Sequence, residues 1–502
     1  MPSNTIKHIV IVGGGSAGWL SAGVIAAEHP HLKVTLIESP DVAPIGVGEG
    51  TWPTMRDTLR KIGVSESDFF RECDAAFKQG SKFRGWVTGQ EDDYYFHPFV
   101  LPEGYGETNL SARWQERHAD VPFADLVSFQ PHLCEHGRAP KQAVTPEFAA
   151  VANYGYHLDA GKFGVFLRKH CIDKLGVTFI ADHVSAINSH ENGDIASLQT
   201  REHGALAGDL FIDCTGMQSL LLGKHFGIEF LSQKHVLFND SALAIQIPYP
   251  DPESPIASQT TSTAQSEGWI WDIGLPARRG IGYVYSSAHS TDEKAEQVLR
   301  RYIGTDHGTP RKLSFEPGYR RRFWHRNCVA IGLSAGFIEP LEASALALVE
   351  LSAAMVSDEM PATRAVMDIV ARRFNEAFTY RWERVIDFLK LHYVLSKRTD
   401  SAYWLDNRKA PERLDELLAL WRYRPPSRTD FGRIDEVFPS ASYQYVLYGM
   451  GFHTEYSTAA RHPEQADAYF KEAATLTTKM LAALPANRAL IAHICRHGLH
   501  SI

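Results

Sequence analysis

The chain has 502 residues, 44% of them hydrophobic, so it is too long for one ordinary core and too apolar for a disordered protein. Its formal net charge of -8 argues against nucleic acid or an anionic membrane as a partner, and the chain contains no run of about 20 apolar residues that would predict a membrane-spanning helix. Six cysteines lie far apart, without CxxC or Cys/His ligand spacing, which predicts reduced thiols, no metal site and a cytoplasmic protein.

The first predicted element is a βαβ unit with a glycine-rich turn. Residues 9–12 and 34–37 form short apolar runs typical of buried parallel strands, and residues 22–28 between them have helical character. The pattern GxGxxG follows the first strand, and Glu38 stands 20 positions after its last glycine. The glycines let a pyrophosphate approach the helix N-terminus, and Glu38 suits ribose hydroxyls, which disfavours NADP. The residues predicted to bind the dinucleotide are Gly13, Gly15, Ser16, Ala17, Gly18 and Glu38.

Two later segments indicate which dinucleotide is bound. The segment DLFIDCTGMQS (Asp209–Ser219) resembles a strand end of FAD-dependent oxidoreductases, and CVAIGLSAGFIEP (Cys328–Pro340) resembles their late flavin-binding strand and turn. The second segment reads GLSAG where that branch usually has GDAAG, so it lacks the aspartate. The resemblance implies FAD rather than NAD and a Rossmann-like α/β fold whose sheet receives strands from distant parts of the chain. It also implies flavin contacts at Gly332, Gly336 and Leu341.

Nine motifs, in family order, resemble those of the flavin-dependent halogenases, the branch typified by tryptophan halogenases. The resemblance covers roughly residues 6–460 and implies a FAD-binding module over residues 1–360. That module is interrupted by substrate segments at about 85–150 and 230–320, and a mainly helical subdomain over 361–502 closes the substrate site. The motifs are GGGSAGW (13–19), IGVGEGTWP (45–53), AAFKQGSKFRGW (75–86), YYFHPF (94–99), YHLDAGKF (156–163), GWIWDIGLP (268–276), GYVYSS (282–287), GLSAGFIEPLEAS (332–344) and FLKLHYVLSKRTDSAYW (388–404).

The activity that the resemblance implies starts from reduced FAD, O2 and a halide, either bromide or chloride, which together give a hypohalous acid. Halogenation of an aromatic ring then needs a group that polarises or holds this acid and a base that removes the ring proton. Lys78, in AAFKQG, matches the family's catalytic lysine, which acts by a hydrogen bond or a transient haloamine. Glu342, in EPLEAS, matches the catalytic glutamate. Lys82 and Glu339 are the neighbours with which these two are most easily confused.

Two further parts of the halogenation site follow from the resemblance. The backbone amides of Ser344 and Ala345 are predicted to bind halide, where the family's ESTG reads EASA. Trp269 and Trp271 lie on one face of an extended segment and are predicted to wall the flavin off from the organic substrate, with core packing as the alternative. Gly274 stands where the family's WxWxIP segment has proline, and this change is expected to loosen the segment because glycine lacks a fixed φ.

The predicted substrate depends on what matches the family and what is missing. His97 and Phe99, in YYFHPF, match residues that sandwich a flat aromatic ring. Residues 438–457 show no clear equivalent of the side chains with which tryptophan halogenases hold the ammonium and carboxylate of the amino acid. A small neutral aromatic is therefore predicted, first indole or an indole derivative, then a phenol or pyrrole. If a clamp exists, its residues are expected among Tyr443, Tyr445, Tyr448 and Glu455.

Three alternatives stay open at this point. They are a flavin-dependent aromatic hydroxylase, a tryptophan halogenase proper, and a flavin-binding protein of the same fold without halogenase activity. The chain shows no second GxGxxG for a nicotinamide, so a separate NADH-dependent flavin reductase is expected to supply the reduced FAD. A monomer or a homodimer is expected.

Overall fold

The computed structural model describes residues 5–42, 49–304, 307–455 and 463–500. Residues 45–48 of the IGVGEGTWP motif and the last two residues of the 438–457 region lie outside the described residues. The chain forms two compact units, each built from three separate stretches. The first unit comprises Met1–Asp74, Leu158–Gln233 and Glu316–Trp382, and the second comprises Ala75–His157, Lys234–Phe315 and Glu383–Ile502.

The first unit is built on a six-stranded sheet in the order β20-β21-β12-β1-β2-β8. Its strands are parallel except for the short β20–β21 pair, and the three strands β1, β12 and β21 come from distant parts of the chain. Ile9, Val10 and Ile11 of β1 are fully buried, as expected for a strand covered on both faces. The strands are β1 (His8–Val12), β2 (Lys33–Glu38), β8 (Thr178–Ala181), β12 (Leu210–Asp213), β20 (Trp324–His325) and β21 (Cys328–Ala330).

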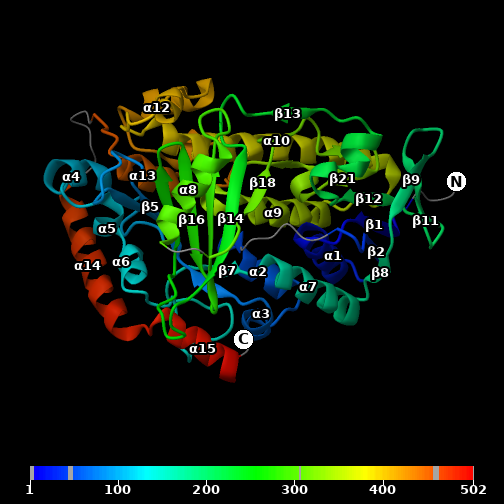
Figure 1. Ribbon diagram of the computed structural model, residues 1–502, viewed down its shortest axis with the longest axis horizontal. Coiled ribbons are helices and arrows are strands. Elements are labelled where there is room, and N and C mark those ends of the chain that lie inside the picture. The colour runs from blue at the N-terminus through cyan, green and yellow to red at the C-terminus, as the bar shows by residue number, and fades with distance from the viewer. Residues whose placement is uncertain (1–4, 43–48, 305–306, 456–462, 501–502) are drawn as a thin grey trace. The chain divides into compact units, whose positions relative to one another are not determined.

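Helix α1 (Ser16–Glu28) packs against both α7 (Ala160–Leu175) and α9 (Ser344–Asp358) in the same unit (Figure 1). Helix α7 is capped at its N-terminus by Asp159, whose side chain accepts a hydrogen bond from the Lys162 amide, and at its C-terminus by Gly176 in a left-handed conformation. The other elements of this unit are β3 (Glu49–Gly50), α2 (Met55–Lys61), α3 (Glu66–Glu72), β9 (Val184–Ser189), β10 (Ile195–Thr200), β11 (Ala205–Ala207), η1 (Gly216–Gln218), the π-helical turn η2 (Leu220–His225), β13 (Phe230–Ser232), β19 (Gly318–Arg320), η3 (Gly332–Ser334), β22 (Gly336–Phe337) and η4 (Leu341–Ala343).

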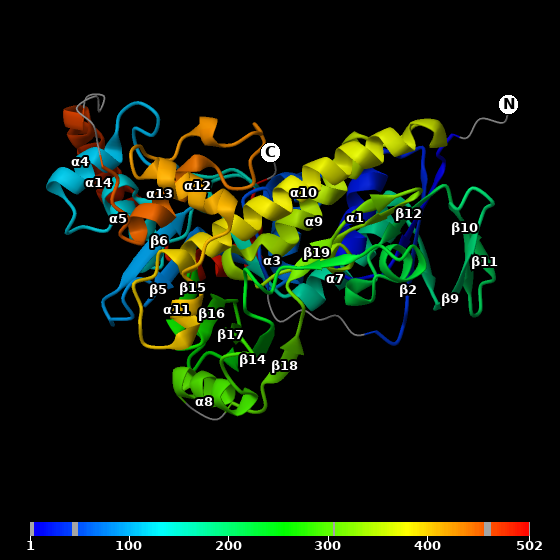
Figure 2. The same cartoon turned by 90° about the horizontal axis from the view of Figure 1, so that it is seen from above.

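The second unit contains a seven-stranded sheet in the order β18-β14-β17-β16-β15-β5-β6. Helix α8 (Asp292–Ile303) covers β14 and β17 (Figure 2). Its Ala295 and Leu299 pack with the buried aliphatic and tyrosine side chains of these strands. The strands of this sheet are β5 (Gly80–Arg84), β6 (Tyr94–Pro98), β14 (Ser241–Pro248), β15 (Thr260–Gln265), β16 (Gly268–Gly274), β17 (Arg278–Tyr285) and β18 (Arg311–Ser314).

Helices dominate the chain after residue 361. The 31-residue helix α10 (Arg364–Val394) begins in the first unit and ends in the second. The remaining elements are β4 (Ala76–Lys78), α4 (Leu110–Arg117), α5 (Phe123–Val127), α6 (Gln130–Glu135), β7 (Gly155–Leu158), α11 (Ala402–Asp406), α12 (Glu412–Trp421), η5 (Arg428–Asp430), α13 (Ser440–Gly449), η6 (Pro463–Gln465), α14 (Ala466–Ala483) and α15 (Asn487–His497).

The fold class is therefore confirmed: a Rossmann-like parallel sheet with a mainly helical C-terminal region. The division into domains at residue 360 stays a prediction. Among the residues that the structure describes, no helix is both long and apolar enough to cross a bilayer.

Candidate functional site

The three segments predicted to bind FAD meet at the carboxyl end of the first unit's sheet. Strands β21, β12 and β1 are neighbours there, and the amide of Ile331 donates a hydrogen bond of 3.0 Å to the carbonyl of Asp213. A Cβ on Gly13 would lie 2.2 Å from the Cys214 carbonyl oxygen, and one on Gly332 would lie 2.7 Å from the Ala17 Cβ. The backbone thus approaches so closely that glycine is required at both positions. Gly18 has the same role within its own turn, where a Cβ would meet the carbonyl oxygen of Gly13.

Gly15 needs a different explanation. A Cβ there would meet nothing within 4 Å, so its glycine is not imposed by neighbouring protein atoms. Gly15 is the N-cap of α1, where no side chain caps the helix and the first turn carries no acidic residue. Open space in front of uncapped helix amides fits a pyrophosphate, which favours the positive end of the helix dipole. The residues present therefore fit FAD at this turn.

Glu38 lies at the end of β2, where an adenosine ribose is expected. Its Oε2 lies 3.9 Å from Nη1 of Arg168. Burial raises the pKa of Glu38, against the opposite effects of Arg168 and Trp19. A half-buried carboxylate at this strand end suits hydrogen bonds from ribose hydroxyls.

Asp213 organises the second of the three flavin segments. Its buried carboxylate accepts hydrogen bonds from the amides of Leu221 and Leu222 at 2.9 and 2.8 Å and from the Thr215 hydroxyl at 2.6 Å. It thereby fixes the turn that leads from β12 into η2. The Ser334 hydroxyl donates to the Asp213 carbonyl, which ties this turn to the GLSAG segment.

The turn before α9 holds Glu342 in an unusual conformation. Glu342 and Ala343 have φ values of 64° and 56°, so two consecutive non-glycine residues are left-handed. The carbonyl of Glu342 accepts a hydrogen bond of 2.7 Å from Trp52 Nε1. Both Glu342 and Glu339 are buried, so burial does not distinguish them, whereas the strained backbone marks Glu342. Leu341, predicted to contact the flavin, is fully buried in the same turn.

Helix α9 begins directly after this turn, at Ser344. Its N-cap is Ala343, whose side chain has no hydrogen-bonding group, so no side chain caps the first amides. The two residues predicted to bind halide, Ser344 and Ala345, are thus the first two of a 15-residue helix. A helix N-terminus favours an anion.

Lys78 lies in the second unit, at the end of β4, and is fully buried. Its Nζ is 5.4 Å from the centroid of the Phe99 ring, one of the residues predicted to hold the substrate. Lys82 differs sharply, because its Nζ forms an ion pair of 2.5 Å with Glu135 and lies over the Tyr94 ring. Only Lys78 of the two therefore has its ammonium against a predicted substrate residue.

His97 lies in β6 (Tyr94–Pro98), and Phe99 is the first residue after this strand. His97 Nε2 lies 2.8 Å from the Ser442 hydroxyl on α13, and its ring borders Phe388 and Phe438, which stack at 3.8 Å between centroids. The Phe99 backbone is held by Gln130, and its ring is only partly buried. The His97 ring is tilted by 56° to Phe388 and by 50° to Phe438, so the three side chains form an aromatic cluster rather than one flat surface.

Trp269 and Trp271 share one face of β16, with ring centroids 6.4 Å apart. Trp269 packs tightly in the second unit's core against Trp86, at 6.2 Å. Trp271 lies across Gly282 on the neighbouring strand, where a Cβ would come within 2.0 Å of the indole. The glycine of GYVYSS is thus required by this tryptophan. A role for the two indoles as a wall stays a prediction.

Gly274 closes β16 and is buried in a crowded place. A Cβ there would lie 3.0 Å from the Tyr249 hydroxyl oxygen and 3.1 Å from the Ala257 amide nitrogen. Tyr249 is in turn covered by Arg488 of α15, 5.0 Å from the ring. Close packing thus favours glycine at this position, and the expected loosening of the segment stays a prediction.

Replacement of Gly274 by proline, the residue of the family motif, is expected to destabilise this chain. The added atoms would overpack against Tyr249 and Ala257, which costs about 1–3 kcal/mol in free energy of unfolding. Urea-induced unfolding measures this change. Gly164→Ala, in α7 with open space around its added Cβ, serves as a control and is expected to be neutral or slightly stabilising. A stability gain from Gly274→Pro would contradict the packing argument.

The tyrosines of α13, which were candidates for an amino-acid clamp, are buried. The Tyr445 hydroxyl donates to the Val100 carbonyl at 3.1 Å, and the Tyr448 hydroxyl lies 3.2 Å from that of Thr454. Tyr443 packs edge-on against Phe388 at 4.9 Å. Glu455 is exposed. The hydroxyls of Tyr445 and Tyr448 are thus used in internal hydrogen bonds.

The sequence did not indicate the role of several residues that contact the predicted site residues. Trp52 lies in a quoted motif, but its hydrogen bond to a carbonyl 290 residues away has no local signal. Gly282 lies in the motif GYVYSS, but its contact with Trp271 depends on the register of two strands, which the motif does not indicate. His157, in YHLDAGKF, is a buried histidine next to Lys78 on the neighbouring strand β7.

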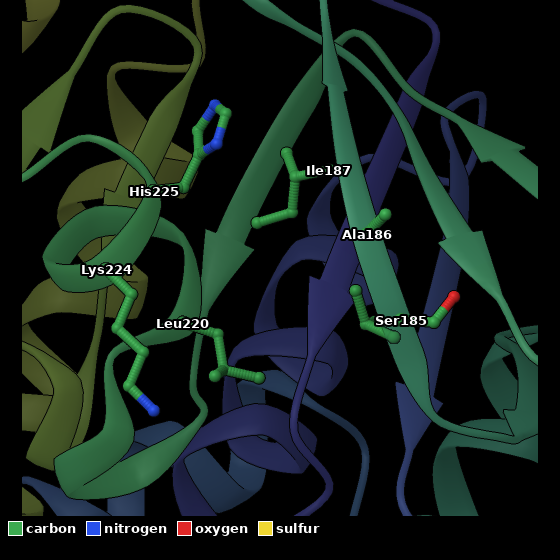
Figure 3. Close-up of a pocket in the computed structure, with 7 residues that line it drawn as sticks. Ser185, Ala186, Ile187, Leu220, Lys224 and His225 are labelled. Carbon is green, nitrogen blue, oxygen red and sulfur yellow. The ribbon is translucent and has the colours of Figure 1, made fainter.

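Two surface cavities lie elsewhere within the units. One, of about 270 Å³, lies in the first unit between β9 and η2 (Figure 3). The other, of about 280 Å³, includes Ser286, His289 and Asp406 of the second unit, joined by hydrogen bonds of 2.9 and 3.1 Å. Ser286 is fully buried, so this chain of groups offers no accessible nucleophile. Neither cavity contains a residue predicted for the flavin or for the chemistry.

Comparison with known proteins gives similarity along almost the whole chain. A family model described as tryptophan halogenase matches residues 8–465. RebH, a tryptophan 7-halogenase of Lentzea aerocolonigenes, is 31% identical over 485 residues, which cover 89% of this chain and 90% of that protein. The crystal structure of a tryptophan halogenase from Shewanella frigidimarina has a TM-score of 0.97 at 50% identity and covers 99% of both chains. BrvH, a flavin-dependent halogenase from Brevundimonas sp. BAL3, has a TM-score of 0.87 at 32% identity and covers 97% of this chain and 99% of its own.

Proposed function

Because the chain belongs to the tryptophan halogenase family and is a flavin-dependent halogenase, we propose that it halogenates a small neutral aromatic such as indole, with Lys78 and Glu342 as catalytic residues. The observation that carries this proposal is the complete burial of Lys78 with its ammonium against the Phe99 ring. A buried lysine without such a task would be costly to retain.

FAD, when bound in its reduced form with O2 present, supplies the oxidant that turns bromide or chloride into a hypohalous acid. The glycine-rich turn before α1 holds the pyrophosphate, and Glu38 accepts hydrogen bonds from the ribose. The amides of Ser344 and Ala345 bind halide at the N-terminus of α9. The residues assigned to FAD are Gly13, Gly15, Ser16, Ala17, Gly18, Glu38, Gly332, Gly336 and Leu341.

Lys78 holds the hypohalous acid by donating a hydrogen bond to its oxygen, which makes the halogen more electrophilic. His97 and Phe99 orient the flat ring so that one carbon faces the halogen. The ring becomes cationic when it accepts the halogen. Glu342 stabilises that charge and removes the proton from the carbon that has reacted.

Free indole is expected to be halogenated at least about tenfold more efficiently than tryptophan. Tryptophan would bring an ammonium and a carboxylate that must lose water, and an unpaired buried polar group costs about 1–3 kcal/mol. Tyr445 and Tyr448 use their hydroxyls internally and offer no clamp. Product formation from each substrate at equal concentration, with bromide, measures the ratio. Faster and regioselective halogenation of tryptophan would show that other residues supply the clamp.

The experiment that tests the function is mass spectrometry of indole incubated with the purified chain, a flavin reductase, FAD, NADH and bromide. We expect the isotope doublet of a monobrominated product, and no NADH consumption when the reductase is left out. Hydroxylated indole formed without any need for bromide would indicate a monooxygenase instead. FAD binding without any brominated or hydroxylated product would indicate a flavin-binding protein without this activity. The separate reductase, a monomeric or homodimeric state and a cytoplasmic location remain predictions.

A further inference from the structure

Strands β4 and β7 form an antiparallel pair, and different side chains lie on its two faces. In the antiparallel register Ala76 lies opposite His157, and Lys78 lies opposite Gly155. Directly opposed and alternate residues share a face, so these four positions lie on the same side of the pair. Lys78 and His157 are thus diagonal neighbours, within reach of a long side chain. The opposite face carries Phe77 and Tyr156.

The two small residues on this face, Ala76 and Gly155, have no side chain long enough to reach the Lys78 ammonium. A lysine side chain has four rotatable bonds, and ordering it costs conformational entropy. His157 is the one large side chain among the other three positions on this face. It is therefore placed to limit where the ammonium can lie.

His157 is held firmly. It is fully buried, and its Nε2 lies 2.8 Å from the hydroxyl of Thr260 on β15. Its Nδ1 forms no hydrogen bond with any residue in the described ranges. Burial lowers the pKa of His157 well below the usual value, and the charge of Lys78 lowers it further. The imidazole is accordingly neutral and does not repel the ammonium.

We propose that His157 is a positioning residue for Lys78, a neutral imidazole oriented by Thr260 that restricts where the lysine ammonium lies on the β4–β7 face. The inference rests on the catalytic role proposed for Lys78. His157 itself touches neither the aromatic substrate nor the halide in this scheme. Its effect is on the fraction of time that Lys78 spends in the productive position.

The test is a pair of substitutions at Thr260, which change the hydrogen bond to His157 without changing the histidine. Thr260→Val keeps the shape but removes the hydroxyl, and the kcat for indole bromination is expected to fall about fivefold to tenfold with KM unchanged. Hydrogen peroxide release should stay near its original value, because Lys78 acts after the hypohalous acid has formed, whereas the hypobromous acid that escapes unused into solution should rise. Thr260→Ser restores the hydroxyl and is expected to return kcat to within about twofold of the original.

Matched controls separate this role from a structural one. Thr261→Val lies next to Thr260 but on the other face of β15, and it is expected to leave kcat within about twofold. His157→Gln keeps a neutral polar group and is expected to be less impaired than His157→Leu. A Thr260→Val enzyme with unchanged kcat, or a Thr260→Ser enzyme as slow as Thr260→Val, overturns the proposal. If Lys78→Met keeps full halogenation, the proposed function fails; if only the Thr260 and His157 variants are unaffected, this inference alone fails.

Discussion

Replacement of Lys78 by methionine is expected to lower the rate of indole bromination by about a thousandfold or more, because it removes the donor that polarises the hypohalous acid. Methionine has a similar length and suits a fully buried position, so the fold should be retained. FAD affinity and hydrogen peroxide release are expected to stay near their original values. Product formation by mass spectrometry, FAD titration by fluorescence and a peroxide assay measure the three quantities on one preparation.

Lys82→Met is the matched control for this experiment. Lys82 lies on β5, forms its ion pair with Glu135 and has its ammonium over the Tyr94 and Phe96 rings. Its loss is expected to change bromination by no more than about twofold, since partly exposed ion pairs contribute little. Loss of FAD binding in Lys78→Met, in step with the loss of bromination, would make Lys78 a structural residue.

Replacement of Glu342 by glutamine is expected to slow halogenation by about a hundredfold or more. The amide has the same shape as the carboxylate, but it cannot accept a proton and carries no charge to stabilise a cationic ring. The strained turn is built by the backbone, with the Trp52 hydrogen bond to the Glu342 carbonyl, so the substitution should leave it in place. Single-turnover product formation measures the effect. The rates with ordinary and with ring-deuterated indole are compared, because only the step that removes the ring proton depends on this deuterium. A normal deuterium isotope effect is expected to appear in the variant.

Glu339→Gln provides the comparison within the same turn. Glu339 has ordinary backbone geometry and is buried, so its change is expected to affect stability more than the rate per folded molecule. If the Glu339 variant lost halogenation and the Glu342 variant kept it, the assignment of the proton acceptor would have to be exchanged between the two.

The flavin segments were predictable because each has a local signal in the sequence. A strand precedes Gly13, Gly15 and Gly18, and a helix follows them. Their spacing in this setting predicts the tight turn and the approach of a pyrophosphate to the helix N-terminus. The adjacency of β1, β12 and β21 followed from resemblance to other flavoproteins, and the sheet order confirms it. These features depend on neighbours in the chain or on a known strand order.

Features that depend on tertiary packing could not be predicted. The left-handed conformation of Glu342 is invisible in EPLEAS, since neither residue of the pair is a glycine. The tight surroundings of Gly274 come from Tyr249 and Ala257, which adjoin it only after the second unit has folded. The partnership of His157 with Lys78 needs the β4–β7 register, which two strands as short as AFK and GYHL do not reveal in the sequence.

The left-handed turn at Glu342 and Ala343 also bears on how this enzyme would respond to selection for heat resistance. Each such residue stores about 1–3 kcal/mol of backbone strain, so Ala343→Gly releases part of it and is a direct route to a higher melting temperature. A glycine at position 343 would also allow the turn to sample other conformations, so the Glu342 carboxylate would no longer be held in one position. A library screened only for thermal survival should therefore accumulate glycine at 343, and the survivors should be robust proteins that halogenate poorly.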